Sequence, residues 1–311
     1  MKKRQIKQTG IEISQIGLGA NAVGGHNLYP NLSEKAGKHL VATAIENDIN
    51  LIDTAYRYGN GRSEELIGEV IQNYDRSKII LATKAAHTDP VKDVFSNSPE
   101  FLTRSVFEAL KRLKTDYLDI FYIHFPDEAT DKRYAIEALQ KLKDNGLIRA
   151  IGVSNFSLQQ LKEANFENQV DIVEDKYNLL DRGNEGGIMS YCLERNIAFI
   201  PFFPLASGVL SGKYNSKKQL ENGDFRSDLT YFSKENLHIV DTAIPYLSSL
   251  AESYKVSIAD IVLNWYLMRK DITSVIPGAK NFDQVLSNLN STKFVLTEKE
   301  WDKINHLFPS I

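Results

Sequence analysis

The chain alternates strand-like apolar runs with helix-like segments from end to end, and this alternation constrains its fold more than any other feature. Eight runs are predicted as strands, and several are almost continuously apolar, as expected for strands covered on both faces. Their ranges are Ile16–Ala20, Leu51–Ala55, Ile79–Lys84, Tyr117–His124, Arg149–Asn155, Ile172–Asn178, Ala198–Pro204 and Ser274–Ala279. Helical patterns fill the gaps, as in Phe101–Lys114, which follows Ser98 as N-cap and Pro99 in the first turn. Eight strands with intervening helices and no break in composition predict a single (β/α)₈ barrel domain over residues 1–311.

Three segments fall outside the minimal barrel. Lys3–Ser14 is predicted as a β-hairpin that plugs the barrel floor, before the first strand. Ser207–Leu237 is a long polar segment after the seventh strand, and a helical stretch near Glu235–Tyr254 precedes a helix at Ile258–Met268. Because long loops at a barrel mouth usually serve function, the polar segment is predicted to be a lid.

The composition indicates a soluble globular protein. Apolar residues make up 42% of the 311, and the 40 acidic and 37 basic residues are mixed along the chain, so no tract favours nucleic acid. The longest apolar-looking run, Ile197–Leu210, is broken by two prolines and is too short to span a membrane. The single cysteine, Cys192, is expected to be a buried structural thiol in a reducing, cytoplasmic setting. We expect a monomer or a loose homo-oligomer.

Polar side chains stand at the ends of three successive predicted strands. Asp53 follows the apolar Leu51 and Ile52 of the second strand, with Tyr58 in the loop after it, Lys84 ends the third strand, and His124 ends the fourth. In a parallel barrel these ends meet at one mouth, where such proteins place their reaction centres. A lysine beside a phenol stabilises its anion and lowers its pKa, an aspartate can fix the lysine, and a histidine can donate to a carbonyl oxygen. The set therefore predicts general acid catalysis.

Each of these residues also has a purely structural interpretation. Asp53 and Lys84 can form a structural ion pair, and His124 at a strand end can be a core histidine with its hydrogen bonds satisfied. Tyr58 is one of 14 tyrosines in the chain. The joint placement on three successive strands favours the functional interpretation.

Six segments, in order along nearly the whole chain, resemble the aldo-keto reductase superfamily. They are Asp53–Glu64, Leu81–Lys84, Asp119–His124, Ile151–Phe156, Pro204–Gly208 and Ile276–Lys280. The resemblance implies a (β/α)₈ barrel that binds NAD(P)H across its mouth and reduces aldehydes or ketones reversibly. It implies no Rossmann G-x-G-x-x-G motif, and the sequence contains none.

The resemblance also assigns roles to individual residues. Tyr58, five residues after the aspartate, is the proton donor, Lys84 and Asp53 tune it, and His124 orients the carbonyl. The implied cofactor contacts are Ser154, Asn155, Glu174, Phe202, Pro204, Leu205, Ser207, Gly208, Leu210, Lys213, Gly278, Lys280, Gln284 and Asn288. Lys280 precedes a predicted helix N-terminus, which suits a 2′-phosphate, so NADP(H) is favoured with NAD(H) as the alternative. Substrate identity lies in the mouth loops, where Tyr29, Phe95 and Phe125 join Tyr58 and His124 as candidate walls; His87 is expected on a surface loop, with a pocket position as the alternative.

Glu174 departs from the family pattern, which usually has glutamine at this position. A carboxylate only accepts hydrogen bonds, whereas an amide also donates, so one contact to the nicotinamide amide is lost or inverted. A negative charge there also favours the cationic, oxidised ring. We hypothesise that Glu174 shifts the cofactor preference towards the oxidised form or loosens the cofactor.

Two other functions compete with carbonyl reduction. A Schiff-base lyase with Lys84 as nucleophile explains the lysine and its acid but leaves Ser154 and Asn155 without a role. A non-catalytic or regulatory cofactor-binding barrel, like the potassium-channel β subunits, keeps the fold and the cofactor. The intact set of four residues favours the enzyme.

Overall fold

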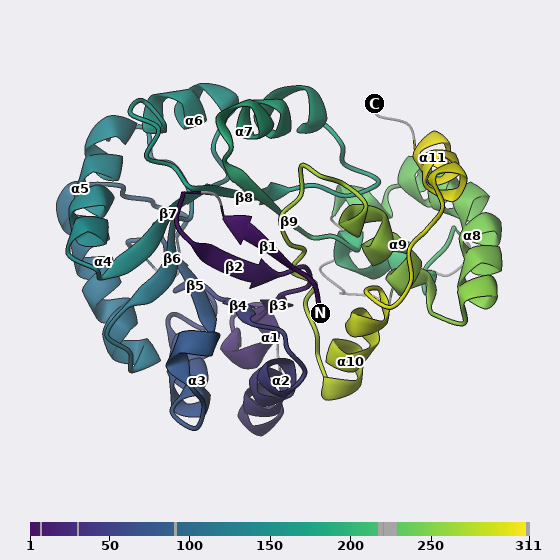
Figure 1. Cartoon of the computed structure of the whole chain (residues 1–311), viewed down its shortest axis with the longest axis horizontal. Helices are drawn as coiled ribbons and strands as arrows, with labels where there is room; N and C mark the ends of the chain where they lie inside the picture. Colours follow the sequence, from purple (N-terminus) through teal and green to yellow (C-terminus); the bar gives the residue numbers. More distant parts are fainter. Residues whose placement is uncertain (7, 30, 90–91, 217–219, 221–228, 309–311) are drawn as a thin grey trace.

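The protein is a curled parallel sheet covered by helices on its outer face (Figure 1). The computed structural model describes residues 1–6, 8–29, 31–89, 92–216, 220 and 229–308. Seven parallel strands pair in sequential order, with each strand between its neighbours in the chain. They are β3 (Leu18–Gly19), β4 (Leu51–Asp53), β5 (Ile80–Ala85), β6 (Leu118–Ile123), β7 (Ile148–Ser154), β8 (Ile172–Lys176) and β9 (Ala198–Phe202). The predicted (β/α)₈ barrel class is confirmed.

The eighth predicted strand, Ser274–Ala279, is present only as two isolated bridges to the start of the sheet. Ile16 pairs with Val275, and Gly19 pairs with Gly278, both in parallel. The amide of Gly19 donates to the carbonyl of Pro277 at 3.2 Å. A proline has no amide hydrogen to continue a ladder, so this segment closes the barrel without forming a regular strand.

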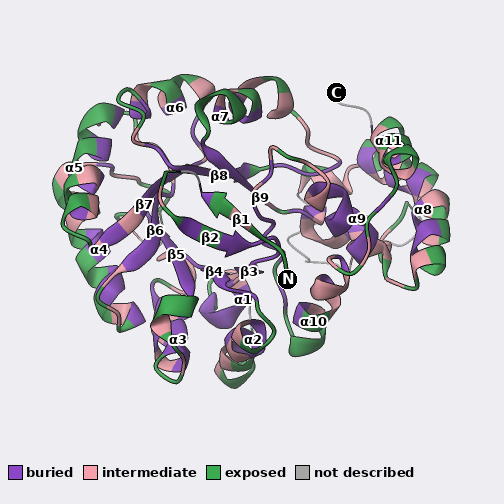
Figure 2. Cartoon of the chain, viewed as in Figure 1, coloured by how far each residue is buried: buried purple, intermediate pink, exposed green. Residues whose placement is uncertain are grey.

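The helices cover the sheet with their apolar faces inward (Figure 2). They are α1 (Asn21–Gly24), α2 (Glu34–Glu46), α3 (Arg62–Ile71), α4 (Pro99–Leu113), α5 (Lys132–Asp144), α6 (Leu158–Ala164), α7 (Ser190–Arg195), α8 (Lys234–Tyr254), α9 (Ile258–Leu267), α10 (Phe282–Asn290) and α11 (Glu298–Leu307). In α4, Leu102, Val106 and Leu113 are fully buried, and the Ser98 hydroxyl caps the helix by accepting from the Phe101 amide. No helix within the described residues is both long and apolar enough to cross a membrane.

The N-terminal hairpin lies across one end of the sheet, as expected (Figure 1). Strands β1 (Lys3–Ile6) and β2 (Ile11–Ser14) pair antiparallel. Their inward side chains join the interior cluster of the barrel and are completely buried or nearly so; they are Ile6, Ile11 and Ile13. The hairpin therefore closes the end of the barrel where the strands begin and leaves the opposite mouth for polar groups.

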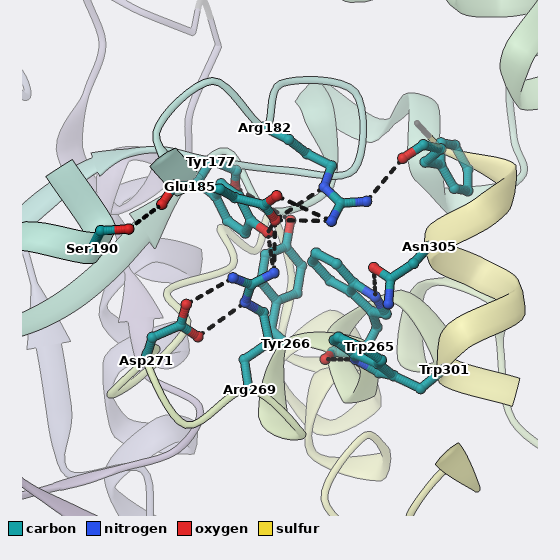
Figure 3. Close-up of polar contacts among 11 residues, drawn as sticks. Tyr177, Arg182, Glu185, Ser190, Trp265, Tyr266, Arg269, Asp271, Trp301 and Asn305 are labelled. Atoms are coloured by element: carbon teal, nitrogen blue, oxygen red, sulfur yellow. Dashed lines mark hydrogen bonds and ion pairs between the residues drawn. The ribbon is translucent and has the colours of Figure 1, made fainter. Parts of the chain in front are cut away.

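A polar network ties the chain after β8 to the end of α9 (Figure 3). Arg269 Nη1 donates to the Glu185 carboxylate and to the Tyr177 hydroxyl, both at 2.7 Å, and its Nε and Nη2 donate to Asp271 at 3.0 and 2.7 Å. Arg182 also donates to Glu185, at 3.0 and 3.2 Å. The Glu185 carboxylate thus accepts hydrogen bonds from two arginines and a phenol. We call the five residues the Arg269 network; they are Tyr177, Arg182, Glu185, Arg269 and Asp271.

The polar segment predicted as a lid is only partly described. Residues 217–219 and 221–228 lie outside the described residues. The helix expected near Glu235–Tyr254 is α8, and the one expected at Ile258–Met268 is α9. Cys192 is 1% exposed, and burial raises the pKa of its thiol to about 12, which confirms the prediction of a buried thiol.

Candidate active site

The alternation of side chains along the strands places the candidate residues at the mouth. The interior cluster contains Leu51 on β4, Ala82 on β5, Tyr122 on β6 and Ile172 on β8. Side chains two residues apart on a strand share a face, so the residue two positions further on also points inward. These next positions are Asp53, Lys84, His124 and Glu174.

Lys84 is the centre of the site and is 1% exposed. Its ammonium forms an ion pair with Asp53 on the neighbouring strand and donates to the Thr54 carbonyl at 3.0 Å. A second acid is also present, because Oε2 of Glu174 lies 3.2 Å from Lys84 Nζ. Two carboxyl groups therefore flank one ammonium in the barrel interior.

Tyr58 and His124 lie beside this lysine. Lys84 Nζ is 5.8 Å from the centre of the Tyr58 ring, and the Tyr58 and His124 rings are perpendicular with centroids 6.5 Å apart. His124 is 8% exposed, and its carbonyl accepts from the Asn155 side-chain amide at 3.0 Å. The four residues predicted as a catalytic set are therefore brought together.

The ionisation of Tyr58 and Lys84 reflects burial and crowding of charge. Burial raises the pKa of Tyr58 above its ordinary value; Lys84 lowers it, but the charges of Asp53 and Glu174 raise it. The lowering expected from Lys84 is thus present but outweighed. Burial works to lower the pKa of Lys84, but Asp53 and Glu174 outweigh it, so that pKa is raised and the ammonium persists.

His124 is a neutral imidazole in this setting. Burial, followed by the charges of Lys84, His87 and Arg57, holds its pKa well below the ordinary value. Its Nδ1 is buried and has no hydrogen-bond partner among the described residues. A neutral imidazole can still donate one hydrogen bond, which is what the orientation of a carbonyl oxygen requires.

Several buried polar atoms on these strands have few or no hydrogen-bond partners. Among the described residues, Asp53 Oδ2, His124 Nδ1 and the Tyr122 hydroxyl are buried without a hydrogen-bond partner, and Glu174 Oε2 has only its ion pair with Lys84. Tyr122 faces Lys84, with its ring centre 5.4 Å from Nζ, and it fits because Gly152 on β7 has no side chain: a Cβ there would lie 2.2 Å from the ring. Buried polar atoms in a native protein are rarely left unpaired, so this concentration marks a site built for a ligand.

The predicted nicotinamide contacts flank this centre on β7 and β8. Ser154 pairs with Glu174 across the two strands and is 1% exposed. Asn155 has a positive φ of 59°, and its side chain donates to Ser154 Oγ at 3.1 Å. Hydrogen bonds to Ser154 and to the His124 carbonyl thus hold the Asn155 side chain beside the site.

The segment after β9 has an unusual backbone. Phe203, Ala206, Ser207 and Gly208 have positive φ angles, of 53°, 47°, 55° and 99°. Positive φ is uncommon outside glycine, and such strain concentrates at ligand clamps. Phe202 is half-buried and packs edge-on against Phe203, with centroids 5.2 Å apart. Three further predicted contacts lie here: Pro204, whose carbonyl accepts from the Tyr266 hydroxyl at 2.8 Å, with Leu205 half-buried and Leu210 fully buried.

The remaining predicted cofactor residues lie at the rim. Lys213, Gly278 and Lys280 are exposed. The Lys280 amide donates to Gln284 Oε1 at 2.7 Å, and the Gln284 amide donates to the Asn281 cap of α10 at 3.0 Å. Lys280 Nζ also lies 5.2 Å from the centre of the Tyr29 ring, whereas the last residue of the set, Asn288, is buried.

The candidate substrate walls divide into two groups. Phe125 stacks on His124 at 4.7 Å and on Phe95 at 4.8 Å, so both phenylalanines line the His124 side of the mouth. His87 belongs to the same aromatic group: it is 5% exposed, and its ring lies 5.7 Å from that of His124. The expected surface position of His87 is therefore wrong, because the bridge between His87 and Phe95 folds this loop back over the mouth. Tyr29 lies against Lys280 instead.

Two features were missed from the sequence. The ion pair between Glu174 and Lys84 was not expected, although alternation along both strands points the two side chains inward. The contact of His87 with His124 was likewise not predicted; it depends on how residues 87–95 fold, and no strand periodicity indicates that.

A parallel barrel whose mouth gathers a phenol, a buried lysine with its acids and a neutral imidazole is built for acid–base chemistry. The chain belongs to the aldo/keto reductase family, whose model matches residues 15–308. It is 32% identical to the aldo-keto reductase YhdN of Bacillus subtilis, over 98% of this chain and 93% of that protein. It is 29% identical to the NADH-specific methylglyoxal reductase of Escherichia coli, over 96% of each chain. It is also similar to the structure of glycerol dehydrogenase AKR11B4 from Gluconobacter oxydans, with a TM-score of 0.89, 28% identity, and coverage of 98% of this chain and 94% of that one.

Family membership and these relatives establish an NAD(P)-dependent oxidoreductase that acts on small carbonyl compounds.

Proposed function

We propose that the protein reduces aldehydes or ketones to alcohols, reversibly, with Tyr58 as the proton donor. The observation that carries the proposal is the meeting of Tyr58, Lys84 and His124 at one mouth, with unsatisfied polar atoms between them. A bound nicotinamide supplies the hydride, which is chemistry that no side chain can provide. His124 donates a hydrogen bond to the carbonyl oxygen, and Tyr58 gives it a proton as negative charge develops.

The residues present fit a nicotinamide cofactor. Ser154, Asn155 and Glu174 supply polar groups at one end of the proposed site, and Phe202 supplies an aromatic ring beside them. The positive-φ segment at 206–208 turns successive backbone groups into a concave arrangement that suits phosphate. We propose that this segment and Lys213 hold the pyrophosphate.

We propose NADP(H) as the preferred form of the cofactor. Lys280 is exposed beside the N-terminus of α10, and a cation at a helix N-terminus favours an additional phosphate. The relative that is named NADH-specific shows that the family does not determine this choice. Replacing Lys280 by methionine should weaken NADPH binding about tenfold and leave NADH binding unchanged, because only NADPH carries the 2′-phosphate.

The substrate is proposed to be a small carbonyl compound bound on the His124 side of the mouth. The stacked rings of Phe95, Phe125 and His124 form an apolar wall there, with His87 behind it. The relatives named for methylglyoxal and glycerol act on small oxygenated molecules, which supports this size class. The role of Tyr29 as a substrate wall stays a prediction, as do the single-domain organisation, the cytoplasmic location and the oligomeric state.

The Schiff-base alternative fits the site poorly. A lysine that attacks a carbonyl must be neutral, and lysines that do so have lowered pKa values. Lys84 is held as an ammonium by Asp53 and Glu174, and its pKa is raised. A purely binding barrel does not require Tyr58, Lys84 and His124 to meet at the mouth, so their meeting favours an active enzyme.

The test follows reduced-nicotinamide absorbance with a panel of small aldehydes and ketones. Wild type should consume NADPH, and Tyr58→Phe should lose roughly 10²- to 10⁴-fold in kcat, the usual contribution of a general acid. Tyr56→Phe is the matched control, because Tyr56 lies in the same loop but faces Arg112, 5.0 Å from its ring centre. Equal rates for Tyr58→Phe and wild type would reject the assignment.

A further inference from the structure

Lys84 has one acid more than its charge requires. Asp53 on β4 pairs with the ammonium, and Glu174 on β8 reaches it at 3.2 Å from another strand. Both acids are buried, with Asp53 2% and Glu174 3% exposed. With both ionised, the centre would carry a net negative charge in a medium of low dielectric, which is costly.

The two acids have few hydrogen-bond donors around them. Asp53 Oδ2 has no hydrogen-bond donor among the described residues, and Glu174 Oε2 has none there beyond its ion pair with Lys84 Nζ at 3.2 Å. The two carboxyl groups meet at the same ammonium, because both form an ion pair with Lys84 Nζ. Two ionised carboxylates cannot form a hydrogen bond with each other, but a single proton would make one of them a donor to the other.

The surroundings of the two acids favour the proton on Glu174. Burial, followed by the charge of Asp53, raises the pKa of Glu174 well above its ordinary value, although Lys84 opposes the shift. Asp53 interacts more strongly with the ammonium, since it accepts a hydrogen bond from Lys84 Nζ. Such a pair titrates as a unit, so the proton belongs to both residues.

The groups that face Glu174 contribute no second source of protons near neutral pH. Burial raises the pKa of Tyr122 on β6 well above its ordinary value, and burial is also the main cause that raises the pKa of Tyr58. His124 is already neutral because its pKa is lowered. The strands on either side of β8 offer Ser154 and Ile200 in register, and neither titrates.

We propose that Asp53 and Glu174 share one proton, which the pair keeps beside the reduced cofactor and releases when the oxidised cofactor binds. The inference rests on the proposed function, which places the nicotinamide next to Glu174. The oxidised ring carries a positive charge that the reduced ring lacks, and a nearby positive charge favours the ionised acid. The site then has zero net charge in both states: ammonium with one carboxylate beside the neutral ring, and ammonium with two carboxylates beside the cationic ring.

This inference revises the expectation for Glu174. A protonated carboxyl can donate as well as accept, so it matches the hydrogen-bonding capacity of the usual glutamine when the reduced cofactor is bound. An ionised carboxylate adds the charge attraction that an amide lacks when the oxidised cofactor is bound. Glu174 therefore acts as a positioning residue whose proton content follows the charge of the cofactor.

The experiment counts protons released on cofactor binding. Calorimetric titrations of wild type with NADP⁺ and with NADPH, in buffers of different ionisation enthalpy, should show about one more proton released with NADP⁺. Glu174→Gln should abolish that difference, because the amide has no proton to release. Glu185→Gln is the control, since that glutamate belongs to the Arg269 network, and it should keep the wild-type count.

A second measurement uses wild type alone, so it tests the inference even if Glu174→Gln does not fold. Below the pKa of the pair, NADP⁺ affinity should rise about tenfold per pH unit relative to NADPH affinity, as release of one proton requires. Equal proton counts for the two cofactor forms, or a difference that survives in Glu174→Gln, would overturn the inference. Failure to bind either dinucleotide would instead reject the proposed function.

Discussion

Two glutamates in this protein, Glu185 and Glu174, have opposite surroundings. Glu185 lies in the Arg269 network, where Arg182, Arg269 and the Tyr177 hydroxyl donate to it (Figure 3). Burial works to raise its pKa, but these hydrogen bonds and charges outweigh it, so the pKa is lowered. Glu174 shares one ammonium with another acid, and burial raises its pKa well above the ordinary value.

The difference teaches how to tell a structural ion network from a functional one. The Arg269 network has two cations for Glu185 and a separate carboxylate, Asp271, for Nε and Nη2 of Arg269. The Lys84 centre has one ammonium for two carboxyl groups, and Asp53 Oδ2 has no donor among the described residues. A saturated network stabilises the fold, whereas an unsaturated one retains capacity for a ligand or a proton.

The largest expected effect is the loss of kcat when the Lys84 ammonium is removed. Lys84→Met should lower kcat by roughly 10²- to 10⁴-fold, because Tyr58 loses the nearby charge that favours its anion. The measurement is steady-state NADPH oxidation at saturating aldehyde, with a circular dichroism spectrum to confirm folding. A folded variant that keeps kcat within a few-fold of wild type would contradict the role of Lys84.

Breaking the Arg269 network should lower stability and leave catalysis nearly unchanged. Arg269→Met should lower the free energy of unfolding by about 3 kcal/mol, as removal of one partner of a buried ion pair does. The folded fraction should keep nearly wild-type kcat. Urea unfolding measures the loss, and Lys38→Met is the control, because its surface pair with Glu69 should contribute under about 1 kcal/mol. Equal losses in the two variants would remove the distinction between a network and a surface pair.

The pH dependence of the two reaction directions should differ. The acid form of Tyr58 predominates below its pKa, and burial raises that pKa above the ordinary value, so carbonyl reduction should retain its donor throughout the neutral range. Alcohol oxidation needs the phenolate as base, so its kcat should rise by about tenfold per pH unit on the acid side of that pKa. Initial rates in both directions across pH 6 to 9 provide the check. An oxidation rate that falls as pH rises would conflict with Tyr58 as the base.

The smallest predicted effect links the core to the strained segment after β9. Tyr266→Phe removes the hydrogen bond to the Pro204 carbonyl, which should cost about 1 kcal/mol of stability. It should also raise KM for the cofactor a few-fold without changing kcat, because Pro204 adjoins the positive-φ residues. Tyr246→Phe, on α8 with its ring against Lys303 of α11, should change neither quantity. A change in kcat alone would indicate a different role for Tyr266.

The sequence predicted the barrel and the meeting of Asp53, Lys84 and His124 because both depend on strand periodicity, whereas Tyr58 lies in a loop and was found by the family resemblance. Asp53, Lys84 and His124 follow inward-facing apolar residues at two-residue spacing, so local order determines where they point. The eighth strand was over-predicted, since Pro277 interrupts its ladder. The buried position of His87 depends on loop folding, and the ionisation of Tyr58 depends on how burial and several charges combine, which spacing alone does not reveal.

The contrast between the two glutamates can be measured directly by the unfolding free energies of Glu174→Gln and Glu185→Gln in urea. Glu185→Gln should lose about 2 kcal/mol, because two arginines lose their carboxylate. Glu174→Gln should lose little stability, because the shared proton already leaves the centre without net charge and the amide can donate to Asp53 in place of the protonated carboxyl. A loss in Glu174→Gln equal to that in Glu185→Gln would contradict the account.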